Sequence, residues 1–175
     1  ATGEEDPRWR TYEGVLPGFR AELDLPSTAE RWLAWLDDLG HDTSGGAWAT
    51  LAGESSRPAE LSISAFTTDA VVEWLRRQDE PWFAHVSYLR PHPPYAAAGR
   101  WSTRYDPADV DLPTPLEPDP LPLHQMALQV AEAKAPTEEA EIRHLRAQYY
   151  GMISEVDDQL GRIWDRLEES GQWDD

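Results

Sequence analysis

Apolar residues recur at helical spacing in residues 27–40, which predicts an amphipathic helix with a buried stripe of Trp32, Leu33, Trp35, Leu36 and Leu39. Ser27 and Glu30 have the spacing of a capping box, in which the serine oxygen accepts a first-turn N–H group and the glutamate reaches back. Gly40 is suited to end this helix, because glycine adopts the left-handed conformation without strain. The pattern thus predicts both ends of the first helix.

Two further helices are predicted from clear periodicity, and one from a weaker pattern. The second helix begins at Thr67 or Thr68 and runs to residue 77, with a buried stripe of Val71, Trp74 and Leu75. The weaker pattern covers residues 123–135. The longest helix is predicted from an N-cap at Thr137 to a terminator at Gly171. Its apolar stripe comprises Ile142, Leu145, Tyr149, Met152, Val156, Leu160, Ile163 and Leu167.

The run from Trp82 to Leu89 (WFAHVSYL) is short, apolar and rich in aromatic residues, which predicts a buried strand of a parallel sheet. The loop of residues 90–95 (RPHPPY) follows at once, and ligands of open α/β sheets bind at the carboxyl ends of strands. Residues 1–26, 40–60 and the proline-rich stretch 106–122 are predicted to be irregular. One strand without a partner is an incomplete sheet, which indicates that part of the fold is missing.

The net charge of the chain argues against two classes of binding partner. The chain of 175 residues has 33 acidic and 15 basic side chains, for a formal net charge of −18. Such a chain repels phosphate backbones and anionic membrane surfaces, so neither nucleic acid nor membrane is an expected partner. It has no cysteine, and its first residues do not resemble a signal peptide. A cytoplasmic location is expected, although a signal peptide in a missing N-terminal part would change this.

Four segments go beyond secondary structure: residues 66–75 (FTTDAVVEWL), 82–95 (WFAHVSYLRPHPPY), 105–113 (YDPADVDLP) and 149–171 (YYGMISEVDDQLGRIWDRLEESG). In this order, they resemble the sulfatase family of the alkaline phosphatase superfamily. The N-terminal part resembles the phosphonate monoester hydrolases more weakly. The resemblance implies an α/β fold, here a helix-rich fragment, with one or few strands, of a sandwich in which helices flank a central mixed sheet. Residues 1–58 would be a loop-rich insertion with one helix, and residues 59–175 the central part of the catalytic domain.

The family's catalytic nucleophile has no counterpart in this sequence. The family uses a cysteine or serine that is converted to formylglycine, whereas this chain has no cysteine and residues 55–58 (SSRP) do not fit the motif. The N-terminal metal-binding aspartates and the D-H-G metal motif are also absent. The resemblance therefore implies a divalent metal, Ca²⁺ or Mn²⁺, and a nucleophile that lie outside this chain, which would be inactive by itself. The alternative function is a non-catalytic, helix-rich protein-binding module.

Three residues of the 90–95 loop are candidate pocket residues for a small anionic ester. The resemblance implies that His92 contacts the sulfate or phosphonate group and the ester oxygen, where an imidazole can donate to an oxyanion or protonate a leaving alkoxide. A loop histidine capped by neighbouring carbonyls is the other interpretation. Arg90 is either a ligand of the ester or a member of a surface ion pair. Tyr95 is predicted to be a wall of the substrate pocket.

Other titratable residues are given structural roles. His85 is expected to be a core histidine with its hydrogen bonds satisfied, and no third ligand beside it and His92 completes a zinc site. Asp157 and Asp158 are adjacent on a predicted helix and so point in different directions. One is expected to bond to a neighbouring loop and the other to be solvated. No metal ligand is assigned, and the oligomeric state is left open.

Overall fold

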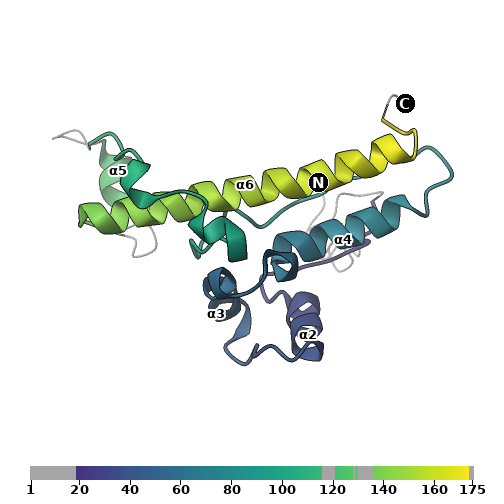
Figure 1. Ribbon diagram of the computed structural model, residues 1–175, viewed down its shortest axis with the longest axis horizontal. Coiled ribbons are helices and arrows are strands. Elements are labelled where there is room, and N and C mark those ends of the chain that lie inside the picture. The colour runs from purple at the N-terminus through teal and green to yellow at the C-terminus, as the bar shows by residue number, and fades with distance from the viewer. Residues whose placement is uncertain (1–18, 116–120, 128, 130–135, 174–175) are drawn as a thin grey trace, which may run out of the picture.

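A computed structural model describes residues 19–115, 121–127, 129 and 136–173. The helices are α2 (Glu30–Asp38), α3 (Gly46–Ala52), α4 (Ile63–Leu75), α5 (Pro122–Ala127) and α6 (Glu139–Glu169). Short 3-10 helices are η1 (Glu54–Ser56), η2 (Ala59–Leu61), η3 (Gly99–Thr103) and η4 (Pro107–Asp109). In Figure 1, α6 runs along one side, α4 lies beside it, and α2 and α3 form a further layer. No described helix is both long and apolar enough to cross a membrane.

Helix α2 is placed by its aromatic core. Trp32 and Leu36 are fully buried, and the Trp32 Nε1–H group donates to the Leu61 carbonyl at 3.1 Å. The predicted cap at Ser27 is wrong, because the helix begins after Ala29, which has a φ of 49° and no side-chain cap. The predicted end is confirmed: Gly40 has a φ of 86°, and N–H groups after the helix return to its last carbonyls.

The core around α2 contains residues from both sides of the boundary predicted at residues 58 and 59. Its buried apolar cluster comprises Ala29, Trp32, Leu36, Leu51 and Ile63. Leu51 belongs to α3, a short helix inside the stretch 40–60 that was predicted to be irregular. That prediction was wrong because α3 has no side-chain cap and begins at Gly45-Gly46, so its stability comes from burial rather than from local signals.

Helix α4 begins earlier than its pattern indicates. It starts at Ile63, where the Ser62 hydroxyl oxygen accepts the N–H group of Ala65 at 3.0 Å. The residues most deeply buried lie in its first half, at Ile63–Ala65 and Thr67–Thr68, and the only other buried residue is Leu75. Val71 and Trp74 are half-buried. The predicted stripe therefore faces partly outward.

Helix α6 buries a different face from the predicted apolar stripe. Its buried residues are Ala147, Gln148, Gly151, Met152, Glu155 and Gln159, so only Met152 of the predicted stripe is buried. The backbone of residues 97–102 lies against this face, and its polar groups pair with glutamine and glutamate side chains. The predicted cap at Thr137 is replaced by Glu138, while Gly171 ends the helix with a φ of 70°, as predicted.

The predicted strand from Trp82 to Leu89 is extended but forms no ladder with any described residue. It is also not buried: Phe83 is 75% exposed, and it meets Phe19 edge-on at 5.6 Å. The reason is that a strand needs a neighbouring strand to satisfy its backbone, and the described residues supply none. The predicted helix over residues 123–135 is seen as α5, and its second half lies largely outside the described residues, as do residues 1–18.

Candidate functional site

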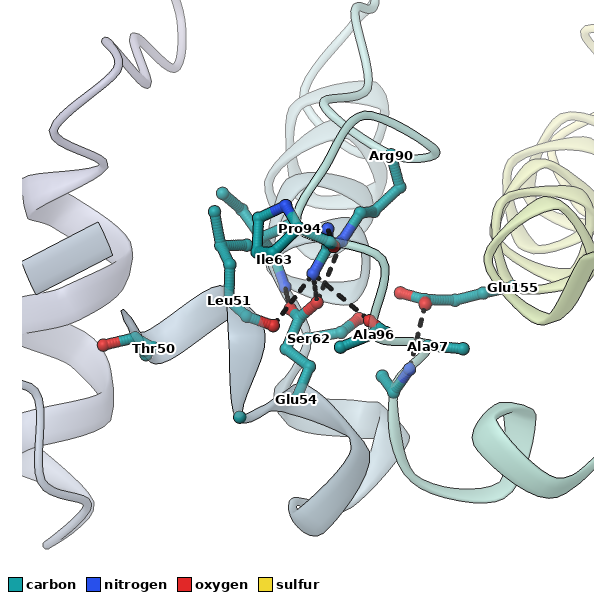
Figure 2. A network of polar contacts seen from close by, with 12 residues as sticks. Thr50, Leu51, Glu54, Ser62, Ile63, Arg90, Pro94, Ala96, Ala97 and Glu155 are labelled. Atoms are coloured by element: carbon teal, nitrogen blue, oxygen red, sulfur yellow. Dashed lines mark hydrogen bonds and ion pairs between the residues drawn. The ribbon is translucent and has the colours of Figure 1, made fainter. Parts of the chain in front are cut away.

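The loop that follows the extended segment lies between two parts of the molecule. On one side are α3 and the start of α4, and on the other is α6 (Figure 2). The peptide bonds Arg90–Pro91 and Pro93–Pro94 are cis. A hydrogen bond of 3.0 Å from the His92 N–H group to the Leu89 carbonyl closes a turn. This hydrogen bond makes the loop a compact bend.

Arg90 is an interior residue of this site. It is 2% exposed, and the structure pairs it with acceptors on all sides. Its Nε–H group donates to Glu54 Oε2 at 2.9 Å, and Nη2 donates to the same oxygen. Its other acceptors are the carbonyls of Leu51 (3.1 Å), His92 (2.9 Å), Pro94 (2.7 Å) and Ala96 (3.3 Å). These bonds favour an internal role for Arg90, and its contact with an ester stays a prediction. The alternative, an ion pair at the surface, is wrong about the location, because the Arg90–Glu54 ion pair is buried.

Glu54 is the counter-ion and is fully buried. Its Oε1 accepts the N–H group of Ile63 at 3.0 Å, so one carboxylate joins η1, the start of α4 and the loop. Burial raises the pKa of the Glu54 carboxyl; the nearby Arg90 charge opposes this rise and the Glu155 charge adds to it. The guanidinium of Arg57 lies in the same region, and burial lowers its pKa.

Helix α6 holds the other side of the loop. Gln148 Oε1 accepts the N–H group of Ala97 at 3.0 Å, and its Nε2–H group donates to the Ser102 carbonyl at 2.8 Å. Glu155 is fully buried, and its Oε2 accepts a long 3.5 Å bond from the N–H group of Ala98. Residues 97–102 are thus paired to a helix that lies about 50 residues further along the chain.

His92 lies exposed on this anchored loop. Its Nδ1 is 2.8 Å from the Pro93 carbonyl oxygen. A carbonyl oxygen only accepts hydrogen bonds, so Nδ1 carries the proton in the neutral ring, and Nε2 then has the free lone pair. Protonation at Nε2 converts that atom from an acceptor to a donor. The contact with the Pro93 carbonyl agrees with the interpretation of His92 as a loop histidine capped by carbonyls. Because the ring is exposed, contact of His92 with an ester stays a prediction.

Tyr95 is 40% exposed and meets Tyr149 of α6 edge-on, with ring centroids 6.0 Å apart. It lines a groove of about 450 Å³ whose polar walls include Ser55, Ser56, His144 and Gln148. The groove borders the loop, so Tyr95 is in a position to form a pocket wall. Its role toward a substrate stays a prediction.

The other titratable residues lie as follows. His85 is exposed, so the prediction of a core histidine is wrong; the segment that carries it is not covered by the described residues. Asp158 accepts from Arg100 Nη2 at 3.3 Å, and Asp157 is exposed, which confirms the expectation that the two carboxylates point differently. Among the described residues, no cluster of histidine, aspartate and glutamate side chains could hold a metal ion.

Sequence reasoning missed Glu54, Gln148 and Glu155. Gln148, Met152, Glu155 and Gln159 recur at helical spacing, so a search for a polar face with that spacing would have identified the two on α6. Glu54 has no such signal. Its partner Arg90 is 36 residues away, in a segment without regular structure.

Comparisons with known proteins point in one direction. The sulfatase family profile matches residues 34–175. The chain is 32% identical to the multifunctional alkaline phosphatase superfamily protein PehA of Trinickia caryophylli, over 99% of this chain and 39% of the relative. It is 30% identical to an arylsulfatase of Clostridium perfringens, over 78% of this chain and 28% of the relative. The solved phosphonate monoester hydrolase of Agrobacterium radiobacter superposes with a TM-score of 0.77 at 32% identity, over 99% of this chain and 39% of that one.

Proposed function

The chain belongs to the sulfatase family, as its motifs predict, and from this premise we propose that it is part of a hydrolase of sulfate, phosphonate or phosphate esters. It spans 39% of the length of the relative PehA. Its part in the reaction is to supply residues of the substrate pocket. None of the relatives named above is a non-catalytic binding module, so the alternative function has no support from them.

The observation that carries the proposal is the geometry of His92. An exposed imidazole lies on a loop whose backbone is bonded to buried side chains on both sides. Its Nδ1–H bond to the Pro93 carbonyl selects the tautomer in which Nε2 exchanges protons. In the proposed reaction, protonated Nε2 donates to the bridging oxygen as the ester bond breaks, so that the alcohol leaves neutral. Tyr95 forms part of the adjoining wall.

The proposal includes groups beyond the described residues. A divalent cation, Ca²⁺ or Mn²⁺, and a formylglycine nucleophile are assigned to other parts of the complete enzyme. A bound cation would neutralise the oxygens of the ester group. The segment Trp82–Leu89 would then be a strand of a central mixed sheet, which supplies the backbone partners that the described residues do not.

The test compares two exposed histidines of residues 1–175, in a complete homologous enzyme that carries these residues. His92→Ala should lower kcat by about two to four orders of magnitude if His92 is the general acid. The loss should be smaller for aryl esters with good leaving groups, because these need no proton. His124→Ala is the matched control and should leave kcat unchanged, since His124 is exposed on α5, outside both the loop and the segment proposed to be a strand.

Assays would use aryl sulfates and phosphonate monoesters with added Mn²⁺ or Ca²⁺. A His92→Ala enzyme with undiminished kcat on poor leaving groups would reject the role proposed for His92. The chain of residues 1–175 alone should show no turnover, because it has no cysteine and its described residues form no metal-binding cluster. Turnover by this chain that persists through repurification would show that the catalytic groups are assigned wrongly.

A further inference from the structure

The loop that carries His92 has few backbone donors of its own. Three of residues 90–94 are prolines, which have no N–H group, so its backbone turn bonds are those from the His92 N–H group to the Leu89 carbonyl and from the Ala96 N–H group to the Pro94 carbonyl, both at 3.0 Å. The carbonyls of His92, Pro94 and Ala96 also accept from one guanidinium, at 2.9, 2.7 and 3.3 Å. Alternate residues of the loop therefore curve around the side chain of Arg90 (Figure 2).

Glu54 fixes this guanidinium in the interior. One carboxylate oxygen accepts from both Nε and Nη2 of Arg90, and the other accepts the Ile63 N–H group at the start of α4. The Leu51 carbonyl of α3 accepts a further bond at 3.1 Å. Both side chains of the ion pair are fully buried, so neither charge is screened by water. The loop is thus attached to α3 and α4 by a single buried ion pair.

We propose that Arg90 and Glu54 are positioning residues that determine where His92 presents its imidazole, an inference that rests on the function proposed above. Arg90 acts through the loop and does not touch the ester, because its donors are engaged by protein acceptors. The role requires the planar fork of a guanidinium, which spreads its N–H groups over a carboxylate and several carbonyls. A lysine ammonium carries the same charge but cannot span these acceptors.

The first test is kinetic and uses the complete homologous enzyme that carries this segment. Arg90→Lys should lower kcat about 100-fold on esters with poor leaving groups, with little change in KM, because a misplaced imidazole donates poorly. In the His92→Ala background the same substitution should cause no further loss, since the residue acts through His92. The matched control is Arg100→Lys. Arg100 is 53% exposed and pairs with Glu60 and Asp158, so this variant should behave like the parent.

The second test needs no activity. In the chain of residues 1–175, the ring ¹⁵N signals of His92 report whether Nδ1 holds the proton that it donates to Pro93. Arg90→Lys should shift these signals toward those of a free histidine, and Arg100→Lys should not. If near-ultraviolet circular dichroism shows that Arg90→Lys unfolds the chain, Glu54→Gln takes its place. That variant keeps the volume of the carboxylate but removes the charge that faces Arg90.

The two tests separate the possible failures. Unchanged His92 signals in a folded Arg90→Lys or Glu54→Gln chain would overturn the positioning role. An equal loss of kcat with and without His92 would also overturn it, because Arg90 would then act directly. Shifted His92 signals together with a fully active His92→Ala enzyme would leave the positioning role standing and reject the function proposed for His92.

Discussion

Gly151 allows the closest approach between α6 and the loop-bearing part of the molecule. A Cβ atom built on it would lie 2.4 Å from the Trp101 carbonyl oxygen and 2.9 Å from the Ala97 Cβ atom. The nearer atom belongs to the backbone, so no side-chain rotation can relieve the clash. Gly151→Ala therefore requires α6 to move away from η3, which carries the backbone bonded to Gln148.

Two opposing terms set the size of this effect. Replacing a glycine in a helix interior by alanine contributes about 1 kcal/mol of stability. Overpacking a close contact costs about 1–3 kcal/mol. Because the clash is with backbone, we take the upper part of this range and expect Gly151→Ala to be destabilised by about 1–2 kcal/mol. At this chain length, 1 kcal/mol corresponds to about 2–4 °C in Tm.

Gly161 provides the matched control on the same helix. A Cβ atom there has no heavy atom within 4 Å, so Gly161→Ala has only the helix gain and should be stabilised by up to about 1 kcal/mol. Urea unfolding followed by tryptophan fluorescence would measure both variants, with Trp101 beside the altered contact. The reasoning fails if Gly151→Ala is as stable as the parent, or if both variants shift in the same direction.

Two further predictions concern the polar contacts and the net charge. Gln148→Leu removes the partners of the buried Ala97 N–H group and the partly buried Ser102 carbonyl, and leaving the Ala97 N–H group unpaired should cost about 1–3 kcal/mol; a loss below 1 kcal/mol in urea unfolding would contradict the pairing. The net charge of −18 should make Tm rise from low to molar KCl, because salt screens repulsion between acidic side chains; a flat or falling Tm would show that this repulsion does not limit stability.

Local signals in the sequence predicted local features well. Gly40 and Gly171 end their helices with a positive φ, because glycine adopts this conformation without strain whatever surrounds it. The face that α6 buries was predicted wrongly, since periodicity counts apolar residues whereas this helix packs against backbone and needs small and polar ones. Periodicity also does not distinguish Gly151, which packs against a neighbouring backbone, from Gly161, which has no neighbouring atom within 4 Å. Which glycine meets a neighbour depends on the neighbour, which lies elsewhere in the chain.

In the candidate site, too, local features were predicted and partners distant in the sequence were not. The position of His92 on a loop after the segment of residues 82–89 followed from the motif and from the prolines around it. The burial of Arg90 did not, because its counter-ion Glu54 lies 36 residues away in a stretch with no regular pattern. A charged side chain is expected at the surface unless a partner is known. No spacing in the sequence identified that partner.

The extended segment Trp82–Leu89 has a consequence for how the chain associates with itself. Uncharged, aromatic-rich stretches that lack a ladder partner are the kind of sequence that seeds cross-β assembly, and Phe83 offers a large apolar surface. Acidic residues and Pro81 stand before this stretch, and Pro91 stands just beyond it. Charge and proline at such places act as gatekeepers, because they interrupt the stacking of identical strands. Residues at both ends of the segment Trp82–Leu89 thus limit the growth of cross-β assemblies.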